Sequence, residues 1–281
     1  PFARFSSNNV KNEVYRTNST STDVTLPFNG ILSGQRAAFT AHSVYYNQTL
    51  NRIEEKAPNP YGVFDILYKD DNAGFSSPNT GFFLGFKQGS LQFKDFDIDK
   101  GIANLVLDIN ESNVTNGNMW VQSIDEVGQV QKNWTRVDKL FGLNSAFNSI
   151  NNNVRDIYTV SSREDDQVSV VFSDGNFGNI PRGIIRVWYR TGLNNSYSLI
   201  PDNFGSSRFS INYIANDGNS YRAQFTASLK ETVNNASARE SIDSIKANAS
   251  RFFGTQDRMV TSDDYSLFPV TVSETIRKIK S

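Results

Sequence analysis

Adjacent carboxylates are the first groups in this sequence whose chemical types could support catalysis. They occur as the pairs Glu54 and Glu55, Asp165 and Asp166, and Asp263 and Asp264. Two carboxylates can share general acid and base roles only when both point into one site. Neighbours on a strand point to opposite faces, and neighbours on a helix diverge by about 100°. The pairs therefore predict no acid–base site, although carboxylates remote in sequence could still meet, and we expect no catalytic residues and no enzyme.

Three alternating aspartates begin at Asp95 and are followed by Gly101, which invites comparison with a calcium loop. An EF-hand loop needs glycine at its sixth position and glutamate at its twelfth, and this sequence has lysine and valine there. The pattern instead predicts a strand with exposed acids and with Phe96 and Ile98 pointing inward.

A glycine-rich loop lies between two apolar strands, a position where some proteins bind phosphate. Phosphate loops continue into a helix or carry Gly-Lys-Ser/Thr, and neither feature is present here. Gly175, Gly178 and Gly183 permit positive φ angles, so a compact structural loop is expected. Phe177 can fill the underside of this loop, and Pro181 can set the entry to the next strand.

The amino-acid composition excludes several further kinds of site and partner. The chain has 281 residues, no cysteine and one histidine, which excludes disulfides, thiolate sites and multi-histidine metal sites within the chain. His42 lies in an alternating run and is expected to be a structural or surface histidine rather than a ligand. The net charge of −1 indicates no nucleic-acid footprint, and no apolar run is long enough to span a membrane. We expect no cofactor, no metal, and neither nucleic acid nor membrane as a partner.

Alternation of apolar and polar residues predicts that most of the chain forms strands. The period of two is clear at Leu105, Leu107 and Ile109 and again at Val168, Val170 and Phe172. Later runs alternate around Asn216-Asp217-Gly218, which predicts a hairpin turn. One face of that hairpin is apolar and must pack on something.

Residues 237–268 have a different period and predict two helices with a short connection. Ser237 with Glu240, and Thr261 with Asp264, form capping boxes. The apolar residues at helical spacing are Ile242, Ile245, Ala249 and Phe252. The expected fold class is therefore α+β, mainly antiparallel β with a capped helical segment near the C-terminus.

Three domains are expected from these shifts in pattern: an N-terminal β or irregular domain over 1–88, a β-rich core over 89–229, and a helical segment with the start of a further domain over 230–281. The chain begins at Pro1 rather than methionine. We interpret it as a fragment of a larger protein.

Two blocks of sequence resemble the baseplate J-like family of contractile tails. The first block comprises Trp134, Asp174, Gly175, Phe177, Gly178, Pro181, Gly183 and Tyr189, and the second comprises Arg258, Val260, Thr261, Asp264 and Tyr265. Ser173 stands where the family often has glycine. The blocks lie in family order and cover roughly residues 118–269, while the first part of the chain is similar in a less specific way to large wedge subunits of T-even-like phages.

The resemblance implies a structural role in a virion. It implies a wedge subunit that forms a homodimer or ring, binds other baseplate wedge proteins, and takes part in tail assembly and conformational switching after assembly in the host cytoplasm. Phe252 and Phe253, at the end of the first predicted helix, are possible interface residues. The alternative, from the abundance of aromatic residues and asparagine, is a β module that binds glycans or a receptor, or attaches a fibre.

Overall fold

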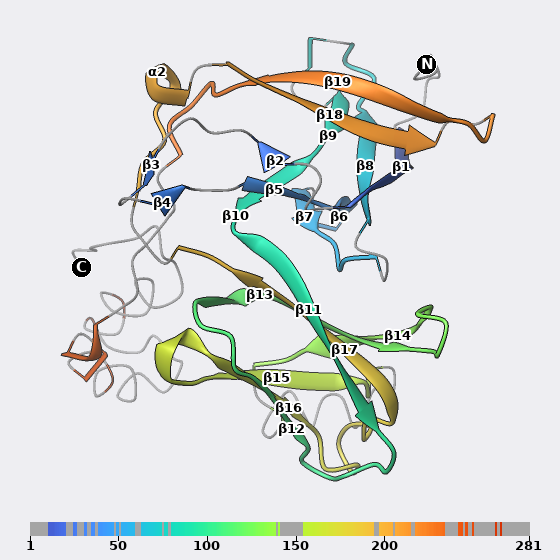
Figure 1. Cartoon of the computed structure of the whole chain (residues 1–281), viewed down its shortest axis with the longest axis vertical. Helices are drawn as coiled ribbons and strands as arrows, with labels where there is room; N and C mark the ends of the chain where they lie inside the picture. The colour runs from blue at the N-terminus through green and yellow to red at the C-terminus, as the bar shows by residue number, and fades with distance from the viewer. Residues whose placement is uncertain are drawn as a thin grey trace. The chain divides into compact units, whose positions relative to one another are not determined.

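Alternating apolar residues build most of the described part of this protein into strands (Figure 1). The structure is a computed structural model that describes residues 11–20, 25–26, 31–32, 35–36, 39–47, 49–50, 52–59, 63–74, 76–77, 80–138, 140, 154–193, 197–204, 206–214 and 217–233, with single or paired positions from 241 to 265. Strands hold 56% of the described residues and helical positions hold 7%. The fold is therefore mostly β.

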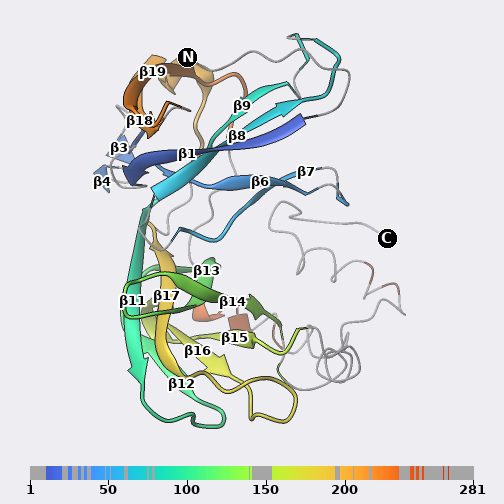
Figure 2. The ribbon, with the colours of Figure 1, turned by 90° about the vertical axis from the view of Figure 1, so that its right-hand side faces the viewer.

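The largest sheet is nearly closed and barrel-like (Figure 2). Its strands lie in the order β11 (Ser90–Ile98), β17 (Gly183–Thr191), β13 (Val114–Ile124), β14 (Val130–Arg136), β15 (Ile157–Ser162), β16 (Val168–Phe172) and β12 (Val106–Ile109). Neighbouring strands are antiparallel except for the short parallel contact of β14 with β15. A three-residue 3-10 helix, η1 (Glu164–Asp166), connects β15 to β16.

The core of this sheet is formed by the inward residues of its strands. Trp134 packs edge-on against Phe172 with ring centroids 5.0 Å apart. The Tyr158 hydroxyl, at the buried end of its ring, donates to the Met119 carbonyl at 3.0 Å. The buried cluster consists of Ile98, Leu107, Ile109, Val114, Met119, Val121, Trp134, Tyr158, Val168, Val170, Phe172, Ile185, Val187 and Tyr189. Apolar side chains from all seven strands thus meet in one interior.

Further strands form smaller sheets. The five-stranded sheet has the order β19 (Ser220–Ser228), β18 (Ser206–Ile214), β1 (Lys11–Thr20), β8 (Val63–Asp70) and β9 (Gly81–Phe83). The three-stranded sheet has the order β10 (Gly85–Gln88), β5 (Phe39–His42) and β2 (Thr25–Leu26). Two pairs complete the described strands: β3 (Ile31–Leu32) with β4 (Gln35–Arg36), and β6 (Val44–Asn47) with β7 (Arg52–Glu55).

Contacts divide the chain into two compact units. The first comprises residues 1–28, 37–193 and 207–227, and therefore holds the seven-stranded sheet together with nearly all of the five- and three-stranded sheets. The second comprises residues 29–36, 194–206 and 228–281. Within it lie the four-residue helix α2 (Pro201–Phe204) and a bridge between Leu199 and Val233.

The predicted α+β class is wrong, because the described residues contain no helix of seven or more residues. Most of the predicted helical segment, residues 237–268, lies outside the described residues. At its described positions the Ile245 N–H donates to the Ser241 carbonyl at 2.9 Å, which is the spacing of one helical turn. Ile242 and Ile245 are 66% and 49% exposed, so the expected apolar face is not buried at these two positions. Helical periodicity alone is a local signal, and packing of an apolar face supplies most of a helix's stability in a folded protein.

The strand predictions are confirmed where the structure describes them. Ile98 is buried on β11, and Phe96 is partly buried beside it. Leu107 and Ile109 are buried on β12. The predicted hairpin turn contains Gly218 at a φ of 82°, between β18 and β19. Its apolar face packs on a second core cluster, through Phe209, Ile211 and Phe225.

Candidate functional site

A cluster of polar and charged residues, most of them buried, lies on the outer face of the seven-stranded sheet. On β17, residues 185, 187 and 189 point into the core, so Arg190 points to the other side. Arg190 is nevertheless only 1% exposed, because β5 and β7 supply residues that cover it. We call His42, Glu55, Lys87 and Arg190, together with Thr40, the Arg190 cluster.

Hydrogen bonds join the cluster across five strands. Arg190 Nη1 donates to Thr40 Oγ1 at 2.6 Å, and Thr40 Oγ1 donates to the Gly89 carbonyl at 2.8 Å. Lys87 Nζ donates to Glu55 Oε2 and, at 2.6 Å, to Asn118 Oδ1. The cluster therefore connects five strands from different parts of the chain: β5, β7, β10, β13 and β17.

Burial shifts the pKa values of two residues in the cluster, His42 and Arg190. Desolvation lowers the pKa of His42 to about 4; Glu55 opposes this effect, while Arg190 and Lys87 add to it. Desolvation also lowers the pKa of Arg190, and Glu55 opposes the shift. His42 is therefore neutral at pH 7, so it is not present as the imidazolium that would act as a general acid. It is buried, at 9% exposed, which favours the structural over the surface alternative of the two that the sequence leaves open.

The space beside the cluster is too small for a substrate. The cavity bounded by His42, Glu55 and Arg190 has a volume of about 10 Å³. A volume of roughly 10–15 Å³ holds one water molecule. The arrangement therefore positions strands, and it does not present His42 to a substrate.

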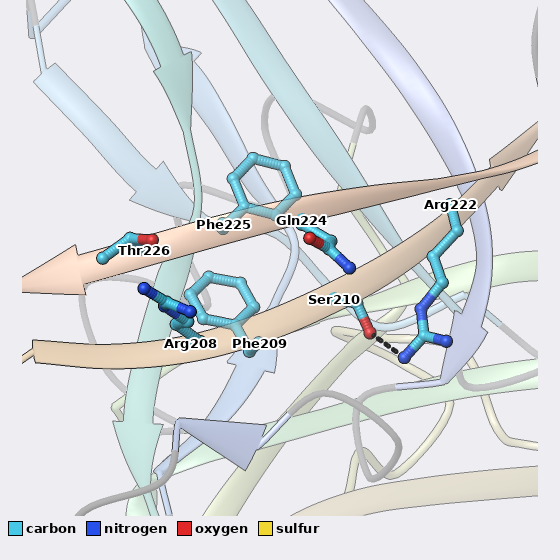
Figure 3. A pocket seen from close by; sticks show the side chains of 7 residues that line it. All are labelled: Arg208, Phe209, Ser210, Arg222, Gln224, Phe225 and Thr226. Carbon is cyan, nitrogen blue, oxygen red and sulfur yellow. Dashed lines mark hydrogen bonds between the residues drawn. The ribbon is translucent and has the colours of Figure 1, made fainter.

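An open pocket lies on the β18–β19 hairpin (Figure 3). It has a volume of about 480 Å³, within the range of small-ligand sites. Arg222 Nη2 donates to Ser210 Oγ at 2.7 Å, and the rings of Phe209 and Phe225 stack with centroids 5.3 Å apart. The lining residues are Arg208, Phe209, Ser210, Arg222, Gln224, Phe225 and Thr226. It combines two guanidinium groups, an amide and two hydroxyls with a pair of aromatic rings.

Within the first motif block, the residues from Asp174 to Pro181 form a structural loop between β16 and β17, which begins at Gly183. Asp174 Oδ1 accepts hydrogen bonds from the N–H groups of Asn176 at 2.9 Å and Phe177 at 3.3 Å. Burial opposes ionisation of Asp174, but these bonds give its pKa a net downward shift. Arg155 Nη2 donates to the carbonyls of Gly175 and Asn176 at 3.2 and 3.1 Å, which fastens the loop to the segment before β15.

Two expectations about this loop are corrected by the geometry. Phe177 is 37% exposed and does not fill the underside of the loop; Ile180 lies against Gly175 instead. Gly175 and Gly183 have positive φ angles of 93° and 75°. Gly178 has no positive φ and is required for another reason, because a Cβ there would lie 2.7 Å from Ile157 Cγ1 and 3.0 Å from the Arg155 carbonyl oxygen.

Replacing Gly178 with alanine should therefore lower the free energy of unfolding by about 1–3 kcal/mol through overpacking. Gly117 is the matched control, since a Cβ there meets no atom within 4 Å. Gly117→Ala should change stability by less than about 0.5 kcal/mol. Urea denaturation of both variants measures the difference, and equal effects would contradict the close-packing argument.

The structure brings together only part of the predicted motif set. Trp134 and Tyr189 lie in the core cluster, and Pro181 is buried before β17. From the second block, Tyr265 is described as an exposed helical position. Arg258, Val260, Thr261 and Asp264, and the possible interface residues Phe252 and Phe253, lie outside the described residues.

Sequence reasoning did not identify the Arg190 cluster; of its members, His42 was considered only by itself. Glu55 had been considered only as half of an adjacent acidic pair. The available signal was a charged residue, Arg190, in a strand whose other residues are largely apolar. Its partners Thr40 and Glu55 are too distant along the chain for any local pattern to identify them.

Fold and site together define a mostly β protein whose nearly closed sheet carries the Arg190 cluster on its outer face. The chain belongs to the family described as Domain of unknown function (DUF8360), whose sequence profile matches residues 1–232. No curated protein and no solved structure matches the chain. In the described part of the chain, no helix has the length and apolar character needed to cross a membrane. The same residues contain no group of three or more His, Cys, Asp or Glu arranged to hold a metal.

Proposed function

We propose that this chain is a structural subunit of a phage contractile-tail baseplate wedge. It forms the inner ring by self-association, binds other wedge proteins, and acts in tail assembly and in the conformational switch of the baseplate. The observation that carries the proposal is the pair of motif blocks that resemble the baseplate J-like family. The geometry of the first block supports it, because Trp134, Tyr189 and the loop from Asp174 to Gly183 are framework residues of one sheet.

The Arg190 cluster supports the mechanical side of the proposal. An assembly that changes shape by moving rigid bodies needs subunits whose own sheets keep their geometry. Arg190 is fully enclosed and joins β17 to Thr40 on β5, while Glu55 on β7 joins Lys87 on β10. Such a buried polar network restrains the relative positions of these strands. The switch then takes place at contacts between subunits.

Self-association is the first measurable consequence of the proposal. Sedimentation equilibrium of the chain over a wide concentration range should show a dimer or ring, because the subunit is proposed to contact its own copies. A parallel size-exclusion experiment should show the chain entering a larger complex when the other wedge proteins are added. A strict monomer that also fails to join those proteins would contradict the wedge assignment.

A glycan-binding module is the second candidate, and the β18–β19 pocket favours it. Two arginines, Gln224 and two hydroxyl groups can hydrogen-bond the carboxylate and hydroxyl groups of an acidic saccharide. This role would be exercised at the host surface rather than within the baseplate.

Calorimetric titration with acidic host-surface polysaccharide tests this second candidate. If the pocket binds the saccharide, Arg222→Gln should weaken binding by roughly tenfold or more, because a charge-assisted hydrogen bond is lost. Arg182→Gln, on the segment before β17, is the control and should bind as the wild type does. Absence of heat with every polysaccharide, or equal loss in both variants, would remove this candidate.

A further inference from the structure

Among the described residues, four buried polar atoms of the Arg190 cluster have no hydrogen-bond partner. They are His42 Nδ1, Glu55 Oε1, Arg190 Nε and Arg190 Nη2. The Arg190 side chain is 1% exposed and that of Glu55 is 14% exposed, so bulk solvent does not satisfy these atoms. Buried polar groups in folded proteins are almost always hydrogen-bonded, either to protein or to ordered water.

The same three side chains line one small cavity. Its volume is about 10 Å³, and its other walls include Pro58, Leu91 and Trp120. Roughly 10–15 Å³ is the space that one water molecule needs, and such a water requires two to four polar partners. Both requirements are met at this position and by these residues.

The distance between the two opposite charges also indicates that a water molecule lies between them. Arg190 Nη2 and Glu55 Oε1 are 3.9 Å apart, which is too far for a direct hydrogen bond. A polar contact at such a distance is commonly bridged by a water molecule. Lys87 neutralises the other oxygen of Glu55 and so leaves Oε1 facing the guanidinium.

We infer that one water molecule is bound in this cavity and completes the Glu55–Arg190 ion pair. Water has two donors and two acceptors, and the four atoms require that set. The water donates to Glu55 Oε1 and to His42 Nδ1, and it accepts from Arg190 Nε and Nη2. Neutral His42 then carries its proton on Nε2, because Nδ1 is the acceptor.

Other small occupants fit the chemistry less well. A halide could accept from the guanidinium, but it has no proton for Glu55 Oε1 or His42 Nδ1. A metal cation would lie against Arg190 and leave Nε and Nη2 without an acceptor. The inference concerns the ion pair between Glu55 on β7 and Arg190 on β17, and it does not depend on the proposed role in a baseplate.

A crystal structure of the whole chain, at a resolution that shows ordered water, tests the site directly. We expect density within hydrogen-bond distance, roughly 2.7–3.2 Å, of the four atoms. Crystals soaked in bromide should show no anomalous peak there. A bromide peak, or a direct hydrogen bond between Glu55 and Arg190 without density between them, would overturn the inference.

Relaxation dispersion of water oxygen-17 gives a second test in solution, because it counts long-lived buried waters. His42→Leu removes one acceptor and should reduce the dispersion amplitude by the contribution of one water. His42→Asn is the matched variant, since its side-chain oxygen can replace Nδ1, and it should keep the wild-type amplitude. Identical amplitudes in all three proteins would contradict a bound water at this cluster.

Discussion

Replacing Arg190 with methionine should lower the free energy of unfolding by about 3–5 kcal/mol, the usual cost of removing one partner from a buried ion pair. Glu55 would keep Lys87 but lose the guanidinium that faces its other oxygen. Thr40 Oγ1 and the Gly89 carbonyl would lose a donor as well. Equilibrium denaturation in urea, with the slope checked for two-state behaviour, measures the loss.

The matched control is Arg163→Met. Arg163 faces Asp108 at 3.4 Å, with the two side chains 37% and 51% exposed, so loss of this pair should cost only about 0–1 kcal/mol. The double variant Arg190→Met, Glu55→Leu should recover part of the loss, because the isolated buried carboxylate is then removed. A cost for Arg190→Met no larger than that of the control would show that the cluster contributes little to stability.

Acid should destabilise the protein through His42, by up to about 3–4 kcal/mol. The pKa of His42 is about 4 in the folded protein and 6.5 in the reference state, and each unit of difference corresponds to roughly 1.4 kcal/mol. Between these values the unfolded chain takes up a proton that the folded chain does not. The contribution is therefore complete above pH 6.5 and is lost as the pH falls through 6.5 toward 4.

The chain has one histidine, so the effect can be assigned to a single residue. Urea denaturation at several pH values should show a steeper fall below pH 6.5 for the wild type than for His42→Asn, in which only the carboxylates titrate in this range. The imidazole resonance should also stay in its neutral position down to about pH 5. An imidazole that titrates near 6.5 in the folded protein would contradict the burial argument.

Local pattern was sufficient for many strands of this fold. The period of two at Leu107 and Ile109, and at Val168, Val170 and Phe172, correctly identified buried faces. These predictions succeeded because alternation on a pleated strand depends only on neighbouring residues. The glycines of the loop were also recognised, although Gly178 is needed for a close approach rather than for a positive φ.

Predictions that required knowledge of the environment were less successful. The class α+β rested on helix caps and apolar spacing in residues 237–268, whereas the described part of the chain is mostly β. Phe177 was expected inside its loop because it is apolar, but Ile180 occupies the position against Gly175. An apolar residue type indicates a tendency toward burial and does not identify which of two nearby residues is buried.

The sequence by itself determined the strand-rich character of this protein, the loop from Asp174 to Gly183, and the absence of disulfides, since each follows from residue types and short spacings. Only the tertiary structure decided the candidate site. Arg190 meets Thr40 across 150 residues of sequence, and Glu55 approaches it from another strand pair. No local propensity encodes such a meeting, because it arises when packed sheets enclose a charge whose partners must come from remote strands.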